Sequence, residues 1–170
     1  IMSPAIKYGA IAFEGIRAYW HDGEEQLYLF RAPDHLDRLL QSARLMGMED
    51  PEQTSEQLLD LIVELASANR IREDVHVRPY LFLSGEGTMM ARGPVSFGAV
   101  VVGGKSLIPK EPRPFRLSVS SWRRLEDNAL SPRIKCVANY QAGRMALLQA
   151  EDDGYDGALL LDRDGHVTEE

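Results

Sequence analysis

One segment rich in glycine and proline divides the chain into two unequal parts. Gly103–Pro114 contains two glycines, three prolines and two lysines, a composition typical of a linker rather than of a helix or strand. We therefore expect two lobes: an N-terminal domain over residues 1–104, a linker at 105–114, and a second lobe over 115–170. A chain of 170 residues is long enough for one ordinary domain or two small ones.

Hydrophobic periodicity predicts strands and helices before the linker. An alternating pattern predicts a strand, whereas apolar residues three or four apart predict a helix. The expected strands are 10–19, 26–31, 75–84 and 96–102, and the expected helices are 33–46 and 54–69. The first two strands form a hairpin, the strand at 96–102 is expected to be buried, and Thr54 with Gln57 fits a capping box. Pro79 predicts an edge strand or a bulge, because proline has no amide hydrogen for the sheet.

The segment after the linker is also predicted to contain both strands and a helix. We expect strands at 115–121, 157–162 and 166–170, and a helix at 139–151. The turn Arg163-Asp164-Gly165 joins the last two strands. The whole chain is therefore predicted to have an α+β or mixed α/β architecture in two lobes.

Composition and charge exclude several classes of protein. Hydrophobic residues make up 44% and charged residues 26%, which excludes an intrinsically disordered chain. No run of 18 apolar residues occurs, so we expect no membrane span. The net charge of −7 argues against a nucleic-acid partner. Cys136 is the single cysteine, so a reducing compartment, the cytoplasm, is expected.

Common catalytic signatures are absent. The sequence has no phosphate-binding loop, no complete dinucleotide fingerprint and no Gly-x-Ser-x-Gly motif. Four scattered histidines and one cysteine do not form a metal site. The chain starts at Ile1 and stops within an expected strand, so we expect it to be part of a longer protein.

Lys135 is the strongest candidate for a catalytic residue. The chain has 19 basic residues but only four lysines, and Lys135 lies between Ile134 and the small apolar run Cys136–Ala138 where an extended segment meets a helix. Desolvation at such a place favours the neutral amine, which is a nucleophile able to form a Schiff base. The alternative is a surface lysine whose aliphatic stem covers apolar neighbours.

Three other charged residues have both a functional and an ordinary interpretation. Arg38 either binds a phosphate or carboxylate or lies at the edge of the apolar stripe of its helix. Arg78 shares a strand face with aromatic neighbours, where it needs a partner; a buried ion pair is the alternative. Glu169 follows Val167 in the last strand and is either functional or a solvent-facing residue.

Taken in chain order, several short blocks resemble one known family. They are Tyr8-Gly9, Phe13-Glu14-Gly15-Ile16-Arg17-Ala18-Tyr19, Leu29-Phe30-Arg31, His35-Leu36-x-Arg38-Leu39, Val77-Arg78-Pro79, Ser120-Ser121-Trp122-Arg123, Lys135 with Asn139-Tyr140, Gly154-Tyr155-Asp156, Leu161-Asp162 and Gly165-His166-Val167-Thr168-Glu169. This ordered set resembles the branched-chain amino acid aminotransferases, class IV (fold type IV) pyridoxal-phosphate enzymes, from end to end. The resemblance implies a small N-terminal α/β domain followed by the start of a larger β-rich domain.

The resemblance also implies a cofactor site. Lys135 matches the lysine that forms the internal aldimine with pyridoxal 5′-phosphate and later moves a proton. Arg38 matches the arginine on the cofactor phosphate, and Tyr140 the tyrosine near the phenolate oxygen. Glu169 matches the glutamate on the pyridine nitrogen, where a carboxylate keeps the ring an electron sink.

The implied substrates are small amino acids and 2-oxo acids. Tyr8, Phe13 and Arg78 match positions that line the substrate pocket, and Arg78 matches the arginine that recognises the carboxylate of the acidic co-substrate. The implied reaction is transamination of L-leucine, L-isoleucine or L-valine with 2-oxoglutarate. In the family a partner subunit completes the pocket, which implies a homodimer or a higher homo-oligomer.

The sequence differs from the family pattern at one position of the substrate pocket, and several alternative functions stay open. Many relatives have tyrosine two residues before the strand arginine, where this chain has His76, so fine specificity is open. The family chain is longer than 170 residues. The alternatives are a D-amino acid aminotransferase or an aminodeoxychorismate lyase of the same fold, or a catalytically inactive fragment or binding module.

Overall fold

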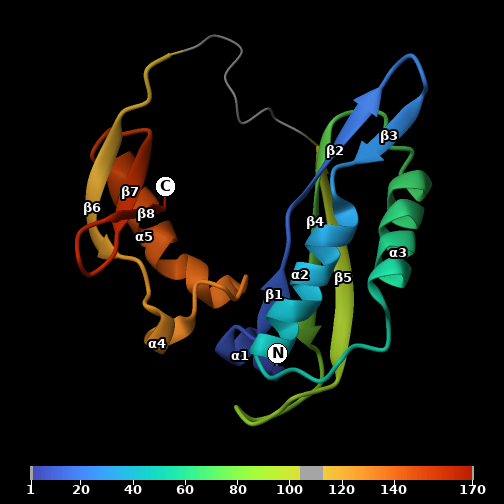
Figure 1. Ribbon diagram of the computed structural model, residues 1–170, viewed down its shortest axis with the longest axis horizontal. Coiled ribbons are helices and arrows are strands. Elements are labelled where there is room, and N and C mark those ends of the chain that lie inside the picture. The colour runs from blue at the N-terminus through green and yellow to red at the C-terminus, as the bar shows by residue number, and fades with distance from the viewer. Residues whose placement is uncertain (1, 104–112, 170) are drawn as a thin grey trace. The chain divides into compact units, whose positions relative to one another are not determined.

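The computed structural model describes residues 2–103 and 113–169, without the side chain of Glu169. The chain forms two compact units, one made of Ile1–Lys105 with Ile134–Cys136 and the other of Ser106–Arg133 with Val137–Glu170. Both units combine a sheet with helices (Figure 1), which confirms the mixed α/β class. Most of the linker predicted at 105–114 lies outside the described residues.

The first unit is built on a five-stranded antiparallel sheet. Its strands are β1 (Ile11–Phe13), β2 (Ile16–His21), β3 (Gln26–Leu29), β4 (Val75–Leu83) and β5 (Val95–Gly103). β4 is central, because it pairs with β1 and β2 along one edge and with β5 along the other. β3 completes the hairpin with β2, as predicted.

Pro79 explains why the strand predicted at 10–19 is divided into β1 and β2. Both strands keep one register on β4, with Ile11 opposite Phe82 and Ile16 opposite Val77. Between them the Glu14 N–H donates to the Pro79 carbonyl at 2.9 Å, but proline has no N–H to donate in return. Of the two structures predicted for Pro79, an edge strand or a bulge, the edge strand is wrong, because β4 is central. The irregularity falls in the neighbouring chain between β1 and β2.

Two helices cover one face of this sheet (Figure 1). They are α2 (Ala32–Leu45) and α3 (Ser55–Ala68), and the predicted capping box of Thr54 and Gln57 is present at the start of α3. The core consists mainly of aliphatic side chains from both helices and from the inner face of β4: Leu36, Leu39, Leu40, Leu58, Ile62, Val75, Val77, Leu81 and Leu83.

Two further differences from the predictions concern exposed parts of this unit. The strand predicted as buried at 96–102 is only partly covered, since β5 pairs with β4 alone within its sheet and Val100 is half exposed. The short helix α1 (Pro4–Tyr8) was not predicted; Pro4 at its first position suits a helix start, and Gly9 ends it with a positive φ of 69°.

The second unit has a three-stranded sheet in the order β6-β7-β8. Its elements are β6 (Leu117–Arg123), α4 (Asp127–Leu130), the 3-10 helix η1 (Val137–Tyr140), α5 (Gln141–Asp152), β7 (Gly157–Leu161) and β8 (Val167–Glu169). β6 and β7 are parallel, and the predicted turn at Gly165 joins β7 to an antiparallel β8. Ala146 and Ala150 of α5 pack on Leu160. Within 2–103 and 113–169, no helix has the length and apolar character needed to cross a membrane.

Candidate functional site

The interruption between β1 and β2 places a carboxylate inside the first unit. Ala12, Glu14, Ile16 and Ala18 are all buried, in keeping with the two-residue period of a strand. Three of these side chains are apolar, but Glu14 is charged and its side chain is fully buried. A buried carboxylate is costly unless it is paired and hydrogen-bonded, so the structure around Glu14 must supply partners.

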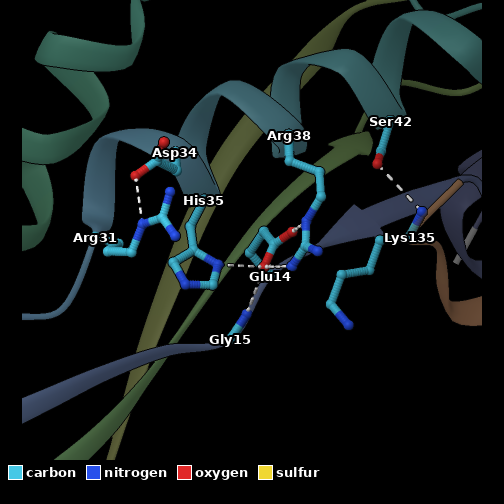
Figure 2. Close-up of polar contacts among 8 residues, drawn as sticks. All are labelled: Glu14, Gly15, Arg31, Asp34, His35, Arg38, Ser42 and Lys135. Carbon is cyan, nitrogen blue, oxygen red and sulfur yellow. Dashed lines mark hydrogen bonds and ion pairs between the residues drawn. The ribbon is translucent and has the colours of Figure 1, made fainter. Parts of the chain in front are cut away.

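Helix α2 supplies two of these partners (Figure 2). Arg38 donates from Nη2 to Glu14 Oε2 at 2.8 Å and from Nε to Glu14 Oε1. His35, one turn earlier, has Nδ1 at 3.0 Å from Oε2, and the Gly15 N–H also donates to Oε2 at 3.2 Å. The carboxylate thus lies in a ring of donors, while the Arg38 side chain remains 52% exposed.

These donors control the charge of Glu14. Burial alone raises the pKa of its carboxyl group, but the hydrogen bonds from Arg38, His35 and Gly15, together with the charge of Arg38, outweigh burial. The pKa of Glu14 therefore lies below its ordinary value of 4.5, and the carboxylate is ionised at neutral pH.

Lys135 is attached to the same part of the fold through its backbone. Its N–H donates to Ser42 Oγ at 3.1 Å, and its carbonyl accepts from the Phe13 N–H at 3.0 Å. An isolated bridge between Ala12 and Cys136 extends this pairing. Ser42 is four residues after Arg38, so one face of α2 holds both the guanidinium and the backbone of Lys135 (Figure 2).

The Lys135 side chain extends over an aromatic residue. Its Nζ lies 4.9 Å from the ring centre of Phe13, and the Phe13 ring is 6.4 Å from that of Tyr80. Lys135 itself is partly buried and is followed by the fully buried Cys136. The Lys135 amine therefore lies on an aromatic surface, in the same part of the fold as the Glu14–Arg38 pair (Figure 2).

The outer face of β4 contributes a titratable residue, His76. A Cβ atom on residue 15 would lie 2.6 Å from His76 Nε2, so only glycine at position 15 lets the imidazole lie where it does. Burial is the largest cause that lowers the pKa of His76, followed by the positive charges of Arg78, Arg17 and Lys135. The imidazole is therefore neutral at pH 7, and the positive charges of these three residues oppose its protonation.

The structure gathers some of the predicted site residues and leaves others apart. Arg38, Lys135 and Phe13 lie together in the first unit, as described above. Arg78 is exposed on β4, which does not fit the alternative of a buried ion pair. Tyr8 ends α1, is 45% exposed and has Lys7 Nζ at 5.3 Å from its ring centre.

Two predicted cofactor residues belong to the second unit. Tyr140 ends η1 and lines a groove of about 360 Å³ with Leu147 and Leu148 of α5 and Leu160 of β7. Glu169 ends β8 and pairs through its backbone with Leu160, and its side chain lies outside the described part of the structure.

Sequence reasoning assigned no role to Glu14, His35 or Ser42. The signal for Glu14 was present: a charged residue at a core position of an alternating run requires a buried partner. Ser42 gave no comparable signal, because a small polar residue within a helix fits many environments. Its bond joins residues 93 positions apart, and such pairings are not visible in local periodicity.

Comparison with known proteins identifies the family. Residues 11–170 match the family model described as amino-transferase class IV, and the chain therefore belongs to the class IV aminotransferases. Within that family it is similar to branched-chain-amino-acid aminotransferases. It is 36% identical to the "Probable branched-chain-amino-acid aminotransferase" of Aquifex aeolicus (strain VF5), over 99% of this chain and 54% of that protein.

Solved structures give the same result. The branched-chain aminotransferase from Thermoproteus uzoniensis with norvaline has a TM-score of 0.90 and 35% identity, covering 99% of this chain and 56% of that one. The branched-chain amino acid aminotransferase from Thermobaculum terrenum in its PLP form has a TM-score of 0.85 and 31% identity, covering 98% and 54%. The chain thus spans about half the length of the relatives it matches.

The neutral state of His76 predicts a pH dependence of stability. As the pH falls below the ordinary histidine value of 6.5, the unfolded chain takes up a proton that folded His76 resists, so the free energy of unfolding decreases. His76→Gln should lose less stability than the wild type between pH 7.5 and 5.5 in urea unfolding experiments. Equal losses in both proteins would show that His76 is not held neutral.

Proposed function

We propose that the full-length protein transfers the amino group of L-leucine, L-isoleucine or L-valine to 2-oxoglutarate, with pyridoxal 5′-phosphate as cofactor. The observation that carries this proposal is that α2 and the adjoining residues 13–14 hold both side chains in one place. Arg38 of α2 pairs with Glu14, and Lys135 is bonded to Ser42 of α2 and to Phe13. The comparisons add support, because the similar structure from Thermobaculum terrenum is a PLP form and the one from Thermoproteus uzoniensis contains norvaline.

The chemistry of these side chains fits the cofactor. A guanidinium is suited to a phosphate group because its N–H donors form a planar fork, and half of the Arg38 side chain is exposed. The Lys135 amine is suited to covalent attachment of an aldehyde. When bound, pyridoxal phosphate supplies a group that carries the amine and a ring that accepts electrons.

Each proposed cofactor residue then has a distinct task. Arg38 would bind the phosphate, and Lys135 would hold the cofactor covalently and move the proton of the substrate α-carbon. Tyr140 would donate a hydrogen bond near the phenolate oxygen, and Glu169 would keep the pyridine nitrogen protonated. These four roles rest on the family resemblance, and the geometry of Arg38 and Lys135 supports two of them.

The substrate side is proposed to use Tyr8, Phe13 and Arg78. Phe13 offers an apolar surface to a branched side chain, next to Lys135 Nζ. Arg78, exposed on the same face of β4 as His76, supplies a donor pair for the second carboxylate of glutamate. Because burying that carboxylate without a partner is costly, one pocket accepts both substrates only if such a donor is present.

The wider organisation is also a proposal. We propose that 1–104 is the small domain and 115–170 the first part of the large domain, and that the protein acts as a homodimer or higher homo-oligomer in the cytoplasm. The family resemblance supports the oligomer, and a single buried free thiol at Cys136 suits a reducing compartment. A monomer in sedimentation experiments on the active protein would contradict the oligomer.

The assignment of Lys135 is tested by substitution and by chemical labelling. Lys135→Ala should reduce transamination of L-leucine by about 100-fold or more, because the proton-transferring base is lost, while circular dichroism shows an intact fold. Borohydride reduction of the full-length holoenzyme should fix the cofactor to the peptide containing Lys135. Label on the peptides of Lys7, Lys105 or Lys110, or wild-type turnover in the variant, would contradict the assignment.

The role of Arg78 predicts unequal effects on the two substrates. Arg78→Met should lower kcat/KM for glutamate and 2-oxoglutarate by about 30- to 150-fold. This corresponds to about 2–3 kcal/mol of transition-state stabilisation, the loss of one charge-assisted pair. Leucine should be affected much less, since its side chain has no carboxylate. The two half-reactions are measured separately, with thermal unfolding as a control. Equal losses together with a lowered melting temperature would indicate a structural role instead.

A further inference from the structure

The ring of donors around Glu14 does more than satisfy a buried charge, because it fixes the orientation of Arg38. Two donors on one side of the guanidinium, Nε and Nη2, bond to the two oxygens of Glu14 (Figure 2). A bidentate pair of this kind sets the plane of the guanidinium as well as its distance. An exposed arginine without such a partner would sample many rotamers.

Arg38 is held in place because its partner, the Glu14 carboxylate, is buried in the core. Glu14 has no exposed side-chain surface, so moving Arg38 away would leave a buried carboxylate with only His35 and the Gly15 N–H as partners. Removing a partner from a buried charge is strongly unfavourable. Arg38 is therefore held in one position although half of its own side chain is exposed.

This geometry gives Glu14 a function in the proposed site. We propose that Glu14 is a positioning residue, which orients the Arg38 guanidinium for the phosphate group of the cofactor before the cofactor binds. The inference rests on the proposed function, since it takes Arg38 as the phosphate ligand. Pre-orientation strengthens binding because the ordering cost of the side chain is met during folding rather than during association.

A comparison of two ligands separates this role from a merely structural one. Pyridoxal 5′-phosphate and pyridoxal differ in the phosphate group alone, so the ratio of their dissociation constants reports the phosphate contact. Glu14→Gln in the full-length protein should lower the preference for the phosphorylated ligand about tenfold, because the guanidinium loses its charged partner and is then ordered only when the ligand binds. Binding of pyridoxal should stay near the wild-type value. Binding is followed by absorbance titration, so the readout does not depend on turnover.

Two controls accompany the test. Asp34→Asn removes the ion pair between Asp34 and Arg31, the residue that precedes α2. This pair is 3.0 Å long but both side chains are exposed, so the variant should leave the preference unchanged. In an Arg38→Met background, Glu14→Gln should have no further effect on the preference, because Glu14 acts through Arg38. Glu14→Asp retains the charge but moves the carboxylate away from Arg38, because the aspartate side chain is shorter. This variant is used for the same comparison of ligands if Glu14→Gln does not fold.

Each outcome has a definite meaning. If the wild type favours the phosphorylated ligand and the Glu14 variants retain that preference, or lose affinity for both ligands equally, the positioning role is wrong while the proposed function stands. If the wild type binds both ligands equally or neither, the phosphate site is wrong, and with it the proposed function. The inference is supported if the Glu14 variants lower the preference, Asp34→Asn does not, and Glu14→Gln causes no additional loss of preference in the Arg38→Met protein.

Discussion

The pairing of the buried Glu14 carboxylate with Arg38 is the interaction on which the first unit and its site depend. Glu14 occupies a core position of the sheet, and it is stable there because Arg38 and His35 of α2, together with the Gly15 N–H, are bonded to it. The same helix face carries Ser42, which holds the backbone of Lys135. One helix packed over one break in a sheet therefore places the guanidinium of Arg38 and the amine of Lys135 in a common frame.

Local sequence patterns were sufficient for most of the fold. Helices α2 and α3 and the hairpin β2–β3 followed from periodicity, capping and turn residues, and the mixed α/β class is confirmed. The errors have a physical origin in long-range pairing. Pro79 was predicted to mark an edge strand or a bulge, yet it lies in the central strand and its missing N–H faces the break at Glu14. The exposure of β5 depends on which strand pairs with it, which no local pattern encodes.

The site was harder to predict than the fold. Lys135 and Arg38 were singled out from their surroundings, but family resemblance alone assigned their roles. Lys135 reaches the first unit through bonds to Phe13 and Ser42, which lie far away in the sequence. Glu14 could have been recognised as a charge in a core position, whereas nothing in the sequence marks Ser42 as the partner of Lys135.

The most direct measurement is a pair of crystal structures of the full-length protein, one without and one with pyridoxal 5′-phosphate. We expect Arg38 to be bonded to Glu14 in both structures. In the second structure we expect the phosphate to contact Arg38 and the density to be continuous from Lys135 Nζ to the cofactor. A structure in which Arg38 has turned away from Glu14, or in which another lysine holds the cofactor, would contradict the common support of Arg38 and Lys135 by this part of the fold.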